Sequence, residues 1–170
     1  MIEVAWRALR LSLLALIVFG AVLSAALALG AADPPRHHRL HTESETLEGA
    51  WQLPEPPFTL IARGTWSERA SPLDSWHLIF TGADGALRLT LSLHGDASFA
   101  LAPLQADALG FIHLRRPPET NEVWLHVTAH EATLRLNREL AWRGTLPSMA
   151  RVQLRGAQAL RSATLRLYVP

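Results

Sequence analysis

The chain of 170 residues contains no cysteine and no lysine. Without cysteine it has no disulfide, no thiolate nucleophile and no zinc site built on cysteine ligands, so its fold must be held by a hydrophobic core. All 16 basic residues are arginine, and they face 15 acidic residues, for a formal net charge of +1. A surface so balanced lacks the basic patch typical of nucleic-acid binding, and we expect no nucleic-acid partner.

Catalytic and metal-binding patterns are also missing. The chain has no Gly-rich phosphate loop and no GxSxG nucleophile motif. His126 and His130 stand four residues apart, but in the strand that their segment predicts this spacing spans about 13 Å, too far for one zinc ion. His37, His38 and His41 are better explained as solvated side chains of a polar segment. We predict no metal, no cofactor and no enzymatic activity.

The longest apolar run, residues 11–32, contains no charged residue. As a helix it would be about 33 Å long, enough to cross a hydrocarbon core of about 30 Å. Arg7 and Arg10 precede it, which predicts a cytoplasmic N-terminus (residues 1–10) and an exported remainder. We therefore predict an uncleaved, single-pass anchor in the cytoplasmic (inner) membrane of a bacterium, with a periplasmic domain. The alternative is a signal peptide cleaved after Gly30 or Ala32, although the run is longer than a usual signal sequence.

A stripe of small residues lies within this run. Gly20, Ser24 and Ala28 recur every four residues, so they share one face of the predicted helix. In lipid such a stripe lets a second helix approach closely, which predicts a helix–helix interface with another membrane subunit. The alternative is that glycine and alanine are simply common in an apolar segment of this composition.

Residues 33–45 are polar and contain two prolines, which predicts a juxtamembrane linker. From residue 46 onward, hydrophobic and polar residues alternate. The clearest case is residues 86–94, in which four leucines occupy every second position: Leu87, Leu89, Leu91 and Leu93. A strand collects these leucines on one face, whereas a helix would scatter them around its circumference.

Turn signals separate about ten or eleven such segments. Asp84-Gly85, Gly95-Asp96 and Asn137-Arg138 are pairs typical of tight turns between antiparallel strands. Helical periodicity is almost absent after residue 32. The fold class that this predicts for residues 46–170 is all-β, an antiparallel two-sheet sandwich behind one N-terminal transmembrane helix.

The order of these segments resembles the concanavalin A-like (laminin-G-like) jelly-roll superfamily. The matching pieces are FTLIARGTW, SWHLIFTGADGALRLTLSLHGDASF, NEVWLHVTAHEATLRLNREL and ATLRLYV, within residues 46–170. The resemblance implies a jelly roll in which the strand with Trp124 leads into a hairpin with a turn at Asn137, and the last strand returns beside the first. The superfamily includes carbohydrate-binding modules, glycoside hydrolases and structural domains, so it leaves the function open.

Hydrolases of this superfamily carry an ExDxE arrangement that places carboxylates on one strand face around a glycosidic bond. The chain has none: Glu43 and Glu45 fall in the predicted linker, and Glu119 and Glu122 flank a predicted turn without a third acid. The resemblance therefore implies a non-catalytic member of the superfamily.

The candidate contact residues are Trp124 and His126. They share the polar phase of their strand, opposite Val123, Leu125 and Val127, so we expect them to face outward. An outward tryptophan can stack on a sugar ring or anchor a protein interface. The alternative is packing at a sheet edge.

These features predict a non-catalytic, membrane-anchored subunit whose sandwich docks on a larger membrane assembly, for example a respiratory or photosynthetic complex. Its expected partners are membrane lipids and other membrane subunits, and a glycan is possible. The alternative is a carbohydrate- or envelope-binding module. The sequence does not select the partner complex, the glycan or the oligomeric state.

Overall fold

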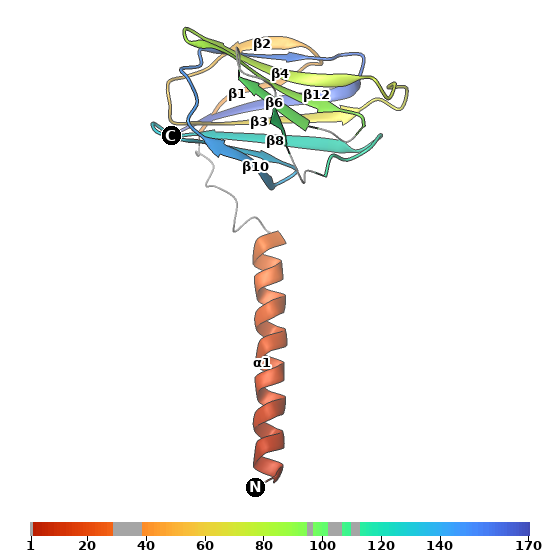
Figure 1. Ribbon diagram of the computed structural model, residues 1–170, viewed down its shortest axis with the longest axis vertical. Coiled ribbons are helices and arrows are strands. Elements are labelled where there is room, and N and C mark those ends of the chain that lie inside the picture. The colour runs from red at the N-terminus through yellow and green to blue at the C-terminus, as the bar shows by residue number, and fades with distance from the viewer. Residues whose placement is uncertain (1, 29–38, 95–96, 102–106, 110–112) are drawn as a thin grey trace. The chain divides into compact units, whose positions relative to one another are not determined.

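The computed structural model describes residues 2–28, 39–94, 97–101, 107–109 and 113–170. The chain divides into two compact units, residues 1–35 and 36–170. The first contains one helix, α1 (Ile2–Ala28), and the described part of the second is built from strands (Figure 1). The prediction of an antiparallel all-β sandwich is confirmed.

The predicted membrane anchor is wrong. The structure describes this helix, α1, as Ile2–Ala28. Within the described ranges, no helix combines the length and the apolar character that a membrane crossing requires. This finding overturns the predicted transmembrane helix, the cytoplasmic-membrane localisation and the periplasmic placement. It also leaves the predicted lipid and membrane-subunit partners without support.

The stripe of Gly20, Ser24 and Ala28 lies on α1. A Cβ added at Gly20 would meet no atom within 4 Å. The stripe's role as a helix–helix interface stays a prediction, and the argument from packing in lipid no longer supports it. The end of the predicted span and the first part of the predicted linker, residues 29–38, lie outside the described residues.

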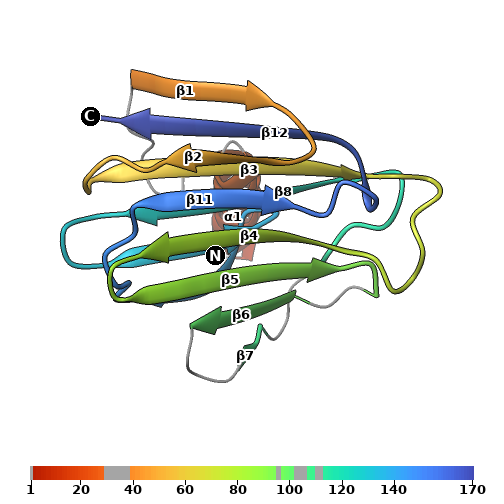
Figure 2. The same cartoon turned by 90° about the horizontal axis from the view of Figure 1, so that it is seen from above.

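The second unit is a sandwich of two six-stranded sheets, in which every pair of neighbouring strands is antiparallel. Sheet A has the order β1 (Arg39–Glu45), β12 (Leu160–Val169), β3 (Phe58–Trp66), β8 (Thr120–Val127), β9 (Ala132–Leu136) and β10 (Glu139–Gly144). Sheet B has the order β2 (Gly49–Gln52), β11 (Arg151–Arg155), β4 (Ser75–Gly82), β5 (Gly85–Ser92), β6 (Ala97–Leu101) and β7 (Asp107–Ala108). Figure 2 shows strands β11, β4, β5, β6 and β7 of sheet B side by side.

The sandwich begins earlier than the sequence suggested. Residues 39–45, predicted as part of a linker, form β1, which pairs with β12 at the edge of sheet A. The two strands are also joined by an ion pair, in which Arg166 Nε donates to Glu43 Oε1 at 2.7 Å. An edge strand is half solvated and accepts charged residues, so its composition resembles that of a linker.

The core lies between the inner faces of the two sheets. On β5, Leu87, Leu89 and Leu91 are fully buried, as their alternation predicted. Leu93 follows the end of the strand and is only partly buried against the core. The largest fully buried side chains come from both sheets: Trp66, Trp76, Phe58, Phe80, Leu60, Leu78, Leu125, Leu134 and Leu136.

The predicted turn between the last hairpin strands is confirmed. Asn137 and Arg138 have φ angles of 49° and 75° and connect β9 to β10 as a two-residue loop. Positive φ at both central positions matches the right-handed twist of the flanking strands, and asparagine tolerates this conformation. The predicted Gly95-Asp96 turn lies outside the described residues.

Leu89→Ala tests the core assignment. Because Leu89 is fully buried, we expect the variant to lose about 2–5 kcal/mol of unfolding free energy, measured by denaturant titration. The matched control is Leu73→Ala, since Leu73 is 86% exposed and its truncation removes almost no buried surface. Equal losses in the two variants would contradict the assignment.

Candidate functional site

A polar groove of about 580 Å³ lies on the outer face of sheet A. We call it the sheet A groove. Its size is within the range of about 300–1,000 Å³ that is typical of small-molecule sites. Its lining comes from strands β3, β8 and β12, from the segment before β8 and from the β9–β10 turn: Arg63, Thr65, Arg115, Thr120, Glu122, Asn137, Arg138, Ser162, Ala163 and Thr164.

Glu122 is the anchored carboxylate of this groove. It lies opposite Arg63 in the β3–β8 register, and Arg63 Nε donates to its Oε2 at 2.5 Å. Its other oxygen, Oε1, accepts the indole N–H of Trp124 at 2.6 Å. Two donors on two oxygens hold the carboxylate in one orientation, while Arg63 keeps a half-exposed side chain beside it.

Two amide side chains, the buried Asn121 and the partly buried Asn137, position the rim of the groove. Asn121 is fully buried, and it receives the backbone N–H of Arg115 at 2.8 Å while donating to the Arg115 carbonyl at 2.9 Å. Asn137 donates to Asn121 Oδ1 at 2.8 Å and accepts the N–H of Glu122 at 2.9 Å. Because these bonds replace water for buried groups, they fix the backbone of Arg115 and of the β9–β10 turn relative to β8.

The sequence reasoning missed this network, although one signal pointed to it. Asn121 has the same parity as Val123, Leu125 and Val127, so the alternation places a polar side chain on the buried face of β8. A buried asparagine is expected to hold specific hydrogen-bond partners. Which partners it holds cannot be read from the alternation.

The electrostatic balance of the groove is positive. Three arginines, Arg63, Arg115 and Arg138, face the single carboxylate of Glu122. Glu122 is paired with Arg63, and guanidinium groups donate hydrogen bonds in a fixed fork, so the lining can offer donors to hydroxyl or anionic groups.

Neither of the two predicted contact residues, Trp124 and His126, lines the groove. Trp124 lies outside the core cluster, in register with Ile61 and Arg135, yet its side chain is only 7% exposed. The residue is therefore largely covered, and its indole N–H contacts Glu122, which lines the groove. Its role in contacting a partner or a glycan stays a prediction. His126 shares a hydrogen bond of 2.9 Å with the hydroxyl of Thr59 and does not line the groove.

Sheet B carries a second, smaller polar network on its outer face. His77 Nδ1 lies 3.0 Å from the Thr90 hydroxyl, and its Nε2 lies 3.1 Å from the Ser75 hydroxyl. Burial lowers the pKa of His77, and the positive charge of Arg88 lowers it further. The imidazole is therefore mainly neutral at pH 7, and the two hydroxyl groups, which can each donate or accept, fit this state.

The acids and histidines of the described ranges do not gather into a metal site, because no group of three or more could hold an ion there. His41 lies on β1, while His37 and His38 lie outside the described residues. Of the two acids near the β8 start, only Glu122 lines the groove.

Comparisons with known proteins extend this picture at the level of fold. No protein-family model matches the chain, and no curated protein matches it in sequence. Among solved structures, a variant of human galectin-16 aligns with a TM-score of 0.52 at 10% identity, over 77% of this chain and 98% of the galectin. The Caenorhabditis elegans galectin LEC-6 gives 0.53 at 8% identity, over 74% and 96%. A double mutant of Congerin II gives 0.52 at 11% identity, over 74% and 99%.

The sandwich has the galectin fold. This confirms the jelly-roll fold that the resemblance to the concanavalin A-like superfamily implied. Identities of 8–11% show the fold alone, so no residue of the sheet A groove acquires a role from these structures.

Arg88→Ala tests the electrostatics of the sheet B network. Removing this charge should raise the pKa of His77, while burial, the larger cause, should keep it below the ordinary value of about 6.5. Since the folded pKa is lowered, the unfolded chain binds a proton first as the pH falls, and stability decreases below about pH 6.5; this decrease should be smaller in the variant. NMR titration of the imidazole measures the pKa. The control is Arg161→Ala, at an exposed residue of β12. An unchanged pKa in Arg88→Ala would contradict the assignment.

Proposed function

We propose that the β-sandwich is a non-catalytic carbohydrate-binding module and that its glycan lies in the sheet A groove. The observation that carries this proposal is the groove itself, in which arginine, glutamate, asparagine and hydroxyl side chains converge on a space of about 580 Å³. Sugar hydroxyls donate and accept at once, so they are matched by groups of both kinds held at fixed positions.

The pre-organisation of the groove supports this role. Asn121 and Asn137 bind the rim through buried hydrogen bonds, and Glu122 is oriented by two donors. A ligand that enters such a site loses less free energy to the ordering of side chains. The galectin fold of the solved neighbours favours the same class of ligand over a docking role in a membrane assembly, which depended on the anchor.

The exposed guanidinium of Arg115 indicates which glycans the groove would prefer. Beside the Glu122–Arg63 pair, its positive charge favours a glycan that carries a carboxylate or sulfate group. Binding should therefore weaken as the ionic strength rises, since this guanidinium lies at an open surface.

Arg115→Ala tests this site. The side chain of Arg115 is exposed, whereas its backbone is held by Asn121, so the variant should remain folded and lose only the guanidinium. We expect the affinity for an acidic glycan found by glycan array to fall at least about tenfold, because a hydrogen bond to a charged group contributes about 1.5–3 kcal/mol. Isothermal titration calorimetry measures the change.

Two arginines serve as matched controls. Arg116 is the adjacent exposed residue but does not line the groove, and Arg88 lies on the outer face of sheet B. Both Arg116→Ala and Arg88→Ala remove one charge and should keep the affinity. A loss in Arg88→Ala with none in Arg115→Ala would move the site to sheet B, and an array without any bound glycan would overturn the function.

A further inference from the structure

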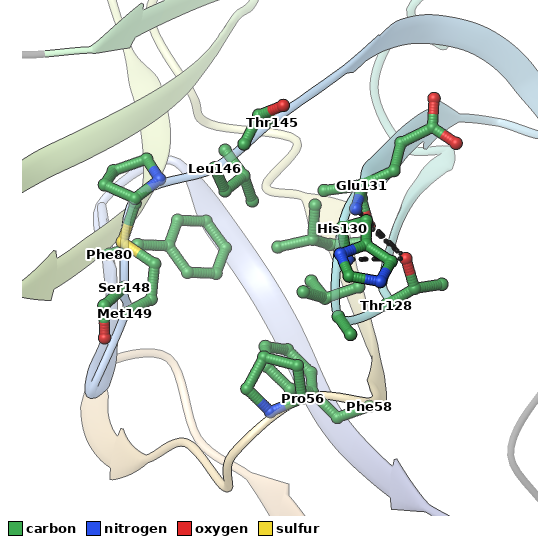
Figure 3. A pocket seen from close by; sticks show the side chains of 15 residues that line it. Pro56, Phe58, Phe80, Thr128, His130, Glu131, Thr145, Leu146, Ser148 and Met149 are labelled. Carbon is green, nitrogen blue, oxygen red and sulfur yellow. Dashed lines mark hydrogen bonds between the residues drawn. The ribbon is translucent and has the colours of Figure 1, made fainter.

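A second cavity opens at one end of the sandwich, between the two sheets. It has a volume of about 250 Å³, and we call it the end pocket. Figure 3 shows its walls. Phe80 of sheet B stands on one side with Leu146 and Met149, which come from the loop between β10 and β11. Phe58 and Pro56 lie at the bottom, and the turn with Thr128 and His130 stands opposite. None of its lining residues belongs to the sheet A groove.

The floor of the end pocket is part of the rigid core. Phe58, Phe80 and Leu125 are 2%, 1% and 1% exposed and belong to the core cluster. Protein interiors are close-packed, and side chains held in a core do not collapse freely into an adjoining space. The pocket is therefore a fixed cavity in continuity with the core.

One wall is held in place by the backbone of β4. The N–H of Ala150 donates to the Thr81 carbonyl at 2.8 Å, which ties the loop of residues 145–149 to sheet B. Gly82 permits this approach, because a Cβ at that position would lie 1.8 Å from the Ser148 carbonyl oxygen. The loop thus stands beside the core edge and leaves the cavity open.

The opposite rim offers polar groups whose bonds and charges are largely satisfied. The Thr128 hydroxyl donates to the Glu131 carbonyl at 2.9 Å and receives the Glu131 N–H at 3.1 Å. The carboxylate of Glu131 is paired with Arg143, whose hydrogen bond lowers the pKa of Glu131. This pairing leaves an apolar interior with an electrically balanced rim.

From this geometry we infer that the end pocket is a binding site for a small uncharged molecule with one apolar ring and a single polar group. A cavity of about 150 Å³ lined by apolar side chains accommodates benzene, so about 250 Å³ holds one ring with a short substituent. The ring would lie between Pro56 and the partly buried apolar side chains of Leu146 and Met149, above the core residues Phe58 and Phe80. The polar group would point to the rim at His130, whose exposed side chain lines the pocket.

Benzyl alcohol is the probe for this site, used with the full chain. In an NMR titration, we expect saturable shifts of the backbone amides around Thr128, Ala132 and Leu146, with glycerol giving none. Bound probe should also raise the thermal midpoint, by an amount that grows with the logarithm of the probe concentration once the site is filled. Absence of saturable shifts, or shifts spread through the whole core, would overturn the inference.

Two variants locate the binding. Ala129 lines the pocket from the exposed turn, so Ala129→Phe adds a ring to the cavity without enlarging a core residue, and we expect the affinity to fall at least about tenfold. Leu146→Gln places an amide in the wall and should weaken binding similarly, whereas Leu140→Gln, at a residue that is 57% exposed on β10, should not. Retained affinity in both pocket variants would contradict the site. Arg115→Ala should leave benzyl alcohol binding unchanged, which separates this inference from the proposed glycan site.

Discussion

The structure depends on the burial of two apolar sheet faces against each other. With no cysteine in the chain, nothing covalent joins the sheets, and the interlocking of residues such as Trp66, Trp76, Leu78 and Leu89 must stabilise the sandwich. Fully burying a large apolar side chain contributes about 1.5–3 kcal/mol. In strands such as β5 and β9 every second residue serves this core, and the alternate residues are left to the outer faces, where the candidate polar site lies.

The outer faces differ in how well they are organised. On sheet A, the buried amide of Asn121 connects the strand face to the segment with Arg115 and, through Asn137, to the β9–β10 turn. That connection crosses the boundary between core and surface, so the stability of the sandwich also fixes the positions of groove residues. On sheet B, the hydrogen bonds of His77 join side chains of the two neighbouring strands β4 and β5 and do not reach a loop or turn.

The sheet A groove and the end pocket differ in the chemistry of their linings. The sheet A groove is open and polar, with surplus positive charge, whereas the end pocket is apolar and continuous with the core. The end pocket depends on a glycine, because the absence of a side chain at Gly82 lets the backbone of Ser148 lie against β4. A solvent-facing ligand and a desolvated one would thus occupy separate places on the same small domain.

The sequence alone determined the elements whose cause is local. Alternating leucines placed Leu87, Leu89 and Leu91 in the core, Asn137-Arg138 marked the last hairpin, and the order of strands indicated the jelly roll. Local composition gave wrong predictions where two kinds of structure have the same composition. A polar edge strand was predicted as a linker, and an apolar helix was predicted as a membrane span. Only the tertiary structure decided the groove, because Arg63, Arg115, Glu122, Arg138 and Thr164 come from separate segments that meet through strand pairing. It likewise decided that Trp124 is covered, since parity tells which face a side chain occupies but not which neighbours lie over it.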